Sequence, residues 1–316
     1  MTRADVAPHK QREAVIIVNP AAHNRPSPKR LREADAWLQG HGWATTWLET
    51  ASPGDATGMA AAAAARGVSL LFVCGGDGTL NEAVNGLAGT ETALAPIPGG
   101  TSNIWAREIG LDKKPAQAVE LAATGDRRRV DLGRAGDRYF LLMAGYGIDA
   151  AVTRRVSLAL KRRLGAAAYV LAALREWLTY RGAHATLRFD GQPHESDVLM
   201  LVAGNTRNYA GLTQITDRAL VDDGLLDVCV YQGKGRLDVA LHVLLTAIRQ
   251  HRRWKKALYR RIRRLEIEWE RPLPLQVDGD PEKSSPTRVE VVPEALWVAV
   301  PRGFTSPLFS APPAPG

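Results

Sequence analysis

The chain has 316 residues, of which 45% are hydrophobic and 23% charged, and its formal net charge is +8. This length exceeds one average domain, and the composition excludes a disordered chain. The positive charge favours polyanionic partners, namely nucleic acid, nucleotide phosphates or anionic lipid headgroups, without choosing between them. The two cysteines, Cys74 and Cys229, lie inside apolar runs and are expected to be reduced and buried, so a disulfide framework is excluded.

No apolar run reaches the roughly 18 residues that a membrane-spanning helix needs, and the N-terminus has no apolar stretch long enough for a signal peptide. The His and Cys residues show no zinc-ligand spacing. The sequence therefore predicts a cytoplasmic protein whose contact with a membrane is peripheral.

Short apolar runs alternate with helical patterns in the first part of the chain, which predicts a parallel α/β sheet. Ligands of such sheets bind beyond the carboxyl ends of the strands, where two glycine-rich turns fall here. The expected strands are 14–18, 43–49, 68–74 and 93–97, and the expected helices are 29–40, 55–66 and 80–88.

After about residue 131 the pattern changes to strand-like segments separated by Asp-Gly turns, with helical insertions at roughly 150–180 and 236–262. This pattern predicts a β-sandwich. The expected strands are 138–144, 184–190, 197–204, 225–231, 263–269, 273–277, 287–292 and 296–300.

The two patterns divide the chain into an α/β nucleotide-binding domain at 12–135 and a β-sandwich domain with helical insertions at 136–300. A Pro-rich tail at 301–316 is expected to be ordered only where it packs back on the body, with the first domain as the expected partner.

The strongest motif is GGDGTLNEAVNGL, which runs from Gly75 to Leu87. Glycines after a strand let the backbone approach phosphates closely, and the helix that follows offers its N-terminus to an anion. Asp77 can hold Mg²⁺, which neutralises a transferring phosphoryl group. A plain strand-to-helix turn requires less than a double glycine, an aspartate and another glycine, so we favour a phosphate site.

A second turn, PGGTSNIWAREIG from Pro98 to Gly110, repeats this pattern one strand later. Thr101 or Ser102 alone is equally compatible with a simple helix cap. Beside the first motif, a shared phosphate site is the better interpretation.

With these motifs the sequence resembles the diacylglycerol-kinase catalytic-domain family, which includes bacterial lipid kinases and the sphingosine and ceramide kinases. The resemblance covers about Val15 to Val300 and is closest to the bacterial branch. It implies a nucleotide domain of the NAD-kinase and diacylglycerol-kinase type, a β-sandwich after it, and transfer of the γ-phosphate of ATP to a lipid hydroxyl. The residues implied to contact ATP are Asn19, Thr50, Gly75, Gly76, Asp77, Gly78, Thr79, Asn81 and Thr101.

The segment RALVDDGLLDV resembles the family's Asp-Gly hairpin that carries a regulatory Mg²⁺. The implied ligands are the side chain of Asp223 and the backbone carbonyls of Leu220 and Leu225. The alternative is a type I′ hairpin turn at Asp223-Gly224, and both interpretations can hold for the same loop.

The segment LQVDGDP resembles the family's Asp-Gly-Glu segment, which implies that Asp278 or Asp280 is the general base for the lipid hydroxyl. Without the resemblance, an exposed hairpin turn would be the better interpretation. Three departures from the family pattern accompany the resemblance. Asp280 replaces a glutamate, His23 replaces a glycine of the first nucleotide loop, and Ile104 follows Asn103 where the family often has Asn-Asp.

Basic residues interleaved with aromatic and aliphatic ones fill 249–264, and a second basic cluster lies at 153–163. Anionic lipid attracts such segments, and a solvated helix face is an equally good interpretation. Nucleic acid is not an expected partner, because no recognised nucleic-acid-binding motif accompanies the charge. The sequence leaves open which lipid is phosphorylated and whether the chain forms a homodimer.

The motif GYGIDA at 145–150 matches a dinucleotide-binding fingerprint, but no second strand with a terminal acid follows it, so dinucleotide binding there is not expected. Two other functions stay open. The first is an NAD kinase, because NAD kinases share the GGDGT motif, although the DDGLLDV segment and the Thr101 turn favour a lipid kinase. The other is a catalytically inactive lipid-binding homologue, which the departures at His23 and Asp280 allow.

Overall fold

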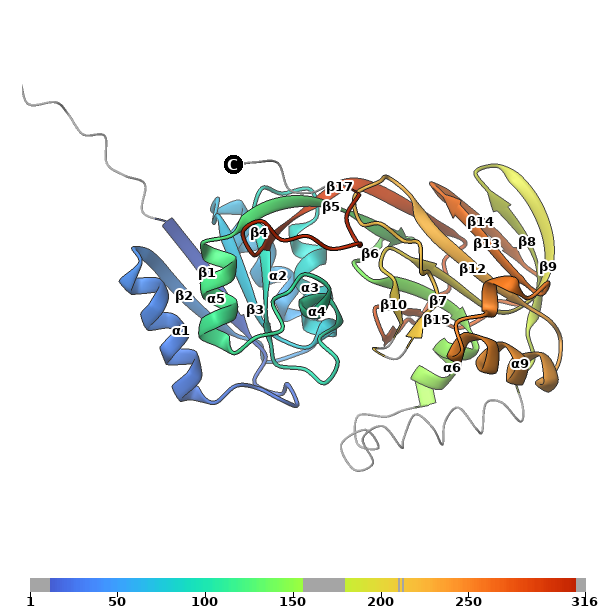
Figure 1. Cartoon of the computed structure of the whole chain (residues 1–316), viewed down its shortest axis with the longest axis horizontal. Helices are drawn as coiled ribbons and strands as arrows, with labels where there is room; N and C mark the ends of the chain where they lie inside the picture. The colour runs from blue at the N-terminus through green and yellow to red at the C-terminus, as the bar shows by residue number, and fades with distance from the viewer. Residues whose placement is uncertain (1–11, 156–179, 210, 212, 311–316) are drawn as a thin grey trace, which may run out of the picture. The chain divides into compact units, whose positions relative to one another are not determined.

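The computed structural model describes residues 12–155, 180–209, 211 and 213–310 (Figure 1). The chain divides into two compact units. Among these residues, an α/β unit takes 12–128 together with Trp297–Phe304, and a β-rich unit takes 129–155, 180–209, 211, 213–296 and 305–310. Strands β5 (Asp126–Ala135) and β17 (Arg288–Val300) each contain a boundary between the units.

The α/β unit contains a parallel sheet with strand order β2-β1-β3-β4, and the end of β17 pairs in parallel with β4. Helix α1 packs against α5, and α2 packs against α3. Its elements are β1 (Arg12–Val18), α1 (Pro28–Gly40), β2 (Trp43–Glu49), α2 (Asp55–Ala65), β3 (Leu70–Gly75), α3 (Asp77–Leu87), β4 (Ala93–Pro98), α4 (Ile104–Glu108) and α5 (Pro115–Ala123).

Buried apolar side chains explain why this sheet forms. The run Ala14–Val18 in β1 and the run Leu70–Gly75 in β3 are buried throughout, as expected for strands covered on both faces. Cys74 is a free, buried cysteine of β3, and burial raises the pKa of its thiol to about 12.

The β-rich unit contains antiparallel pairs such as β8–β9, β9–β12 and β14–β17, and its strands enclose one core. The first part of β9 pairs with β8, and its last residues pair with β7 and β12. The elements are β6 (Arg138–Phe140), β7 (Met143–Gly147), α6 (Ile148–Arg155), β8 (Ala183–Phe189), β9 (Gln192–Gly204), β10 (Asn208–Tyr209), β11 (Thr213–Gln214), β12 (Leu226–Gln232), α9 (Arg236–Ala247), a 3-10 turn (His251–Arg253), β13 (Ala257–Ile262), β14 (Arg264–Trp269), β15 (Leu275–Val277) and β16 (Asp280–Pro281).

The segment after Phe304 belongs to the β-rich unit. Leu308 and Phe309 are buried, and the Leu308 carbonyl accepts a hydrogen bond of 3.0 Å from the Val221 amide.

The expected helical insertion at 236–262 is wrong in its second half. Helix α9 ends at Ala247, and the basic run that follows contains strand β13, which pairs along its length with β12. Pairing with a buried strand overrides the helical pattern of the sequence, because strand preference depends strongly on context. The insertion expected at 150–180 begins as α6, and 156–179 lies outside the described residues.

Two strand predictions also need correction. The segment 138–144 is two strands, because the Leu141 and Leu142 amides donate to the Asp278 carboxylate instead of a strand partner. Conversely, 287–292 and 296–300 form the single strand β17, which continues through Glu294 although the φ of that residue is 50°.

Helices long and apolar enough to cross a membrane are absent from the described residues.

Candidate functional site

In the α/β unit, the carboxyl ends of four parallel strands bring four loops to one edge of the sheet. Val18 pairs with both Glu49 and Cys74, and Gly75 pairs with Pro98. The residues that follow these ends are those that the motifs predicted. This edge is where parallel sheets bind ligands.

The two glycine turns lie with backbone against backbone. The Gly99 amide donates to the Gly75 carbonyl at 2.9 Å. A Cβ atom built on Gly100 would lie 2.4 Å from the Cα of Gly76, and one on Gly76 would lie 3.3 Å from the Cα of Gly100. Side chains are therefore excluded here, and the turns leave backbone amides and the start of α3 as the groups available to an anion.

Asn19 connects the first loop to the GGDGT turn. Its amide nitrogen Nδ2 donates to Thr79 Oγ1 at 2.8 Å, and its backbone N–H donates to the Cys74 carbonyl at 2.9 Å. Thr79 is buried in the first turn of α3, and Asn81 further along this helix is buried as well. The sequence prediction named all three of these residues.

Asn24 is a site residue that sequence reasoning missed. Its backbone N–H donates to the Gly99 carbonyl at 2.9 Å, and its side chain donates to the Gly100 carbonyl at 3.0 Å. These bonds hold the first loop against the second glycine turn, and the neighbouring His23 is exposed. A single polar residue in a loop carries no sequence signal for such a contact.

Asp77 starts helix α3 and reaches α4. Its Oδ1 accepts the Trp105 backbone N–H at 3.4 Å, burial raises the pKa of the carboxyl, and the backbone N–H groups of Trp105 and Ile104 lower it. The carboxylate thus satisfies amides at the beginning of α4. Whether it also holds Mg²⁺ stays a prediction.

The remaining residues predicted to contact nucleotide lie on the same edge of the sheet. The Thr50 backbone N–H donates to the Val18 carbonyl at 3.0 Å, and Thr101 is exposed. Asn103, in a left-handed conformation with φ of 46°, accepts the Gly100 N–H and donates to the Gly100 carbonyl, each at 2.9 Å. Gly78 lies in the first turn of α3.

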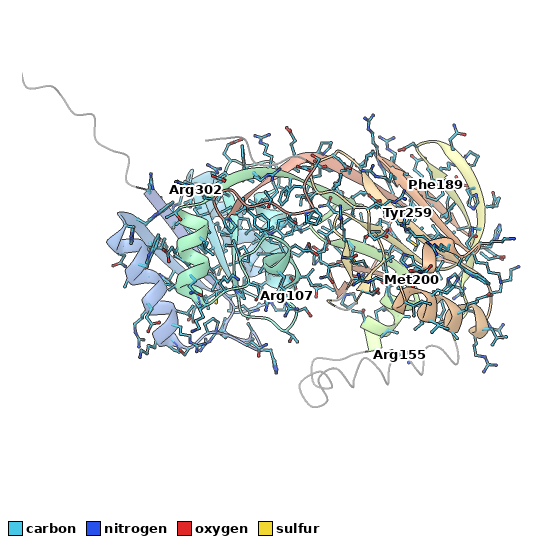
Figure 2. All side chains as sticks on the ribbon, viewed as in Figure 1. Arg107, Arg155, Phe189, Met200, Tyr259 and Arg302 are labelled. Atoms are coloured by element: carbon cyan, nitrogen blue, oxygen red, sulfur yellow. The ribbon has the colours of Figure 1, made fainter. Side chains whose placement is uncertain are left out.

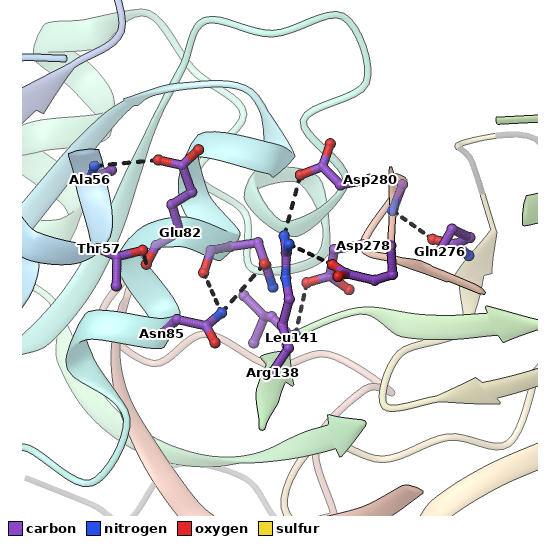
Figure 3. Close-up of polar contacts among 12 residues, drawn as sticks. Ala56, Thr57, Glu82, Asn85, Arg138, Leu141, Gln276, Asp278 and Asp280 are labelled. Carbon is purple, nitrogen blue, oxygen red and sulfur yellow. Dashed lines mark hydrogen bonds and ion pairs between the residues drawn. The ribbon is translucent and has the colours of Figure 1, made fainter. Parts of the chain in front are cut away.

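In the β-rich unit, the predicted acidic turn gives its two aspartates different environments (Figure 3). Asp278 and Gly279 have φ of 49° and 89°, as a type I′ turn requires. The Asp278 side chain is buried, and its carboxylate accepts the backbone N–H groups of Leu141, Leu142 and Met143 at 2.8–2.9 Å. Such a carboxylate is held by the fold rather than presented to a substrate.

Asp280 is the accessible carboxylate of this turn. Its side chain is 47% exposed and lies 3.4 Å from the guanidinium of Arg138, which also pairs with Glu282 at 2.6 Å. Arg138 is a second residue that sequence reasoning missed, because it precedes its partner by 142 residues. The arrangement places the Asp280 carboxylate beside a positive charge.

Gln276 connects the acidic turn to a buried acid. Its Oε1 accepts the Gly279 N–H at 2.7 Å, and its Nε2 donates to Asp149 Oδ2 at 3.2 Å. Tyr209 donates to the same oxygen at 3.2 Å, whereas Asp149 Oδ1 has no hydrogen-bond partner within the described structure. Burial raises the pKa of Asp149. The GYGIDA motif thus supplies a buried acid, which sequence reasoning did not identify.

The loop at 220–225 places Asp223 beside other charges. Asp223 pairs with Arg261 and accepts the Leu225 N–H at 3.1 Å, and Asp131 accepts the Gly224 N–H at 2.7 Å. Within this loop only Gly224 has a positive φ, whereas a type I′ turn at Asp223-Gly224 would need a positive φ at both residues. No strand precedes the loop directly either, so the alternative interpretation as a type I′ hairpin is wrong. Leu220 and Leu225, whose carbonyls are the other implied Mg²⁺ ligands, lie in the same loop. Groups of three or more His, Cys, Asp or Glu with metal-binding geometry are absent from the described residues.

The basic segments can be located in part. Figure 2 shows Tyr259 on β13 of the β-rich unit, where Arg260 and Arg261 are exposed beside it. Arg154 and Arg155 end helix α6, and the rest of the 153–163 cluster lies outside the described residues.

Comparisons with known proteins agree with this architecture. The family model of the diacylglycerol kinase catalytic domain matches residues 13–135, and that of the YegS C-terminal NAD kinase beta sandwich-like domain matches 143–300. The chain is 35% identical to a Pseudomonas putida protein named "Probable lipid kinase YegS-like", over 89% of this chain and 93% of that protein. It is 29% identical to a diacylglycerol kinase of Bacillus subtilis, over 85% of this chain and 90% of that one.

Solved structures show the same fold. A diacylglycerol kinase structure from Bacillus anthracis is 23% identical, with a TM-score of 0.72, over 92% of this chain and 97% of that one. Another structure from the same organism is 26% identical, with a TM-score of 0.75, over 92% of this chain and 98% of that one. The resemblance found in the motifs and the predicted fold class, an α/β domain followed by a β-sandwich, are therefore confirmed. The chain belongs to the diacylglycerol kinase catalytic-domain family, in its YegS-like bacterial lipid kinase branch.

Proposed function

We propose that this protein is a lipid kinase that transfers the γ-phosphate of ATP to the hydroxyl of a diacylglycerol-like lipid at a membrane surface. The observation that carries the proposal is the contact of the two glycine turns, at which a Cβ on Gly100 would meet the Cα of Gly76 at 2.4 Å. Backbone packed this closely at a strand-to-helix edge suits the phosphates of a nucleotide. The names of the relatives supply the lipid acceptor.

In this proposal ATP lies along the α/β edge formed by the loops at Asn19, Thr50, Gly75–Asn81 and Thr101. Amides at the start of α3 bind phosphate oxygens, and Asn24 keeps the first loop in place. The loop geometry and the helix N-terminus support this placement. Most of the rate would then come from positioning and charge neutralisation.

Asp280 is our candidate for the general base. Its carboxylate is accessible, whereas that of Asp278 is occupied by three backbone amides. As the hydroxyl oxygen bonds to the γ-phosphorus, its proton passes to Asp280, and the bond from the γ-phosphorus to the bridging oxygen breaks to release ADP. We propose that Arg138 orients the Asp280 carboxylate before the proton arrives.

The loop at 220–225 fits a Mg²⁺ ion in its donor chemistry. A carboxylate from Asp223 and carbonyls from Leu220 and Leu225 are all oxygen ligands, which Mg²⁺ prefers. Burial raises the pKa of Asp223, whereas the charge of Arg261 and the Leu225 N–H lower it, so a bound Mg²⁺ would share this carboxylate with Arg261 or replace it. When bound, Mg²⁺ would neutralise carboxylate charge here and, at Asp77, the charge of the phosphates.

The experiment that tests the proposal is transfer of labelled γ-phosphate from ATP with Mg²⁺ to a panel of lipids in mixed micelles, with NAD⁺ as a parallel acceptor. We expect the label in an organic-extractable lipid. Label only in NADP⁺ would show an NAD kinase. Bound lipid without transfer to any acceptor would show an inactive lipid-binding homologue.

A further inference from the structure

Helix α9 of the β-rich unit (Figure 1) carries apolar side chains on its outward side as well as on its inward side, although a surface helix normally has one apolar face. The inward face is anchored by specific contacts. Val239 is buried, and the buried ring of His242 packs edge-on against Tyr231 with ring centroids 4.8 Å apart. The Tyr231 hydroxyl lies 2.8 Å from Thr246 Oγ1. These contacts determine which side of α9 points outward.

The outward face is a stripe of large apolar side chains. The exposed fractions of Leu237, Val243, Leu244 and Ile248 are 85%, 64%, 57% and 55%. Positions 237, 244 and 248 are separated by seven and four residues, so they lie above one another on one side of the helix. Elsewhere in the described structure, no other large hydrophobic residue is exposed to this degree. Exposed apolar groups that gather in one place mark interaction surfaces.

Positive charge borders this stripe at both ends. Arg236 is exposed where α9 begins, and Arg249, Arg253 and Lys255 are exposed just after it ends. The acidic side chain of the helix, Asp238, pairs with Lys256 at 2.5 Å. A partner for this face must therefore accept both apolar side chains and cations.

We propose that the outward face of α9 docks the protein on an anionic lipid bilayer. Leu237, Leu244 and Ile248 would enter the boundary between headgroups and acyl chains, and the flanking Arg and Lys side chains would lie among lipid phosphates. An apolar stripe with cationic ends matches the depth profile of such a bilayer. A second copy of this chain matches it poorly, because two such faces would bring the same cations together. The inference rests on the proposed function, because a lipid kinase must reach its lipid acceptor in a membrane.

Sedimentation with vesicles tests this inference. Phosphatidylcholine vesicles with and without phosphatidylglycerol are mixed with the wild type and with the triple variant Leu237→Gln, Leu244→Gln and Ile248→Gln. We expect the variant to bind the anionic vesicles at least about tenfold more weakly, because each buried Leu or Ile side chain favours transfer out of water. The matched control places the same glutamines at Ala61, Ala62 and Ala65, which are exposed on α2, and should bind like the wild type.

A charge variant, Arg249→Gln with Arg253→Gln, should weaken binding only to vesicles that contain phosphatidylglycerol, and added salt should remove the difference. Arg32→Gln on α1 is its control. Activity on a water-dispersed short-chain diacylglycerol is measured in parallel, and the triple variant should keep the wild-type rate there.

Unchanged vesicle binding by the triple variant would overturn the inference. So would a wild-type dimer that light scattering shows to dissociate in the triple variant, since a second copy would then cover this face. If the wild type binds vesicles through α9 but phosphorylates no lipid, the proposed function fails while the docking surface stands.

Discussion

The glycine turns of the α/β unit and the acidic turn of the β-rich unit prepare for chemistry in opposite ways. At the glycine turns the important feature is the absence of side chains, because Gly76 and Gly100 touch through their backbones. At the acidic turn the important feature is side-chain chemistry, with one aspartate buried under three amides and another exposed beside Arg138. In the proposed function, backbone amides suit the phosphates of ATP, which are the same in every catalytic cycle. An accessible carboxylate suits the proton that the lipid hydroxyl loses.

The largest expected effect belongs to Asp280. We predict that Asp280→Asn lowers the rate of phosphate transfer to lipid by about 10²–10⁴-fold, the usual contribution of a general base, and leaves the unfolding midpoint unchanged. Transfer is measured under single-turnover conditions. Asp137→Asn, a change of an exposed acid next to Arg138, is the matched control and should keep the wild-type rate.

Asp278→Asn should act on stability instead. An asparagine offers the three amides one acceptor oxygen without charge, so we expect a loss of about 3 kcal/mol in the free energy of unfolding. Denaturant titration measures it. A variant that folds with wild-type stability but transfers no phosphate would mean that Asp278, rather than Asp280, accepts the proton.

Gly100→Ala tests the backbone contact. The new methyl group would meet the Cα of Gly76, so the turns must separate, and we expect kcat/KM for ATP to fall by about 10²-fold. Gly58→Ala is the control, because nothing lies within 4 Å of its Cβ position in α2, and it should stabilise the helix by about 1 kcal/mol. Equal effects of the two substitutions would contradict a special role for the turns.

The smallest effect concerns Asp149 and depends on pH. Because burial raises its folded-state pKa, ionisation of Asp149 costs stability. That cost is absent below the unfolded pKa of about 3.9, grows as the pH rises through the folded-state value, and is complete above it. Asp149→Asn, which keeps an acceptor for Tyr209 and Gln276, should therefore gain stability over the wild type as the pH rises. Thermal unfolding at a series of pH values measures the gain, and an equal loss at every pH would contradict it.

Local patterns were sufficient for β1 to β4 and α1 to α3 of the α/β unit, whereas α5 was not predicted. Strand β2 begins and ends where the alternation of 43–49 predicted, and the glycine turns lie at the predicted edge. Periodicity and turn chemistry are local properties, so a sequence expresses them directly. The same local logic failed for 248–262, where pairing of β13 with β12 decides the structure.

Long-range partners were the other limit. The motif places Asp278 and Asp280 together but does not reveal that Leu141–Met143 occupies the first and Arg138 the second. Asn24 and Gln276 were missed for the same reason, since Asn24 acts through the distant Gly100 carbonyl and Gln276 through the distant Asp149 carboxylate. Such contacts depend on the fold, so motif reading alone cannot distinguish a structural acid from a reactive one.

The most direct test of this division of roles is the affinity for ATP, measured by equilibrium binding on Asp280→Asn and Gly100→Ala beside the wild type. We predict that Asp280→Asn binds ATP with wild-type affinity, because the acidic turn accepts the proton and does not bind the nucleotide. We predict that Gly100→Ala binds ATP about tenfold or more weakly, because the glycine turns bind the phosphates. Loss of ATP binding in Asp280→Asn together with normal binding in Gly100→Ala would contradict the account.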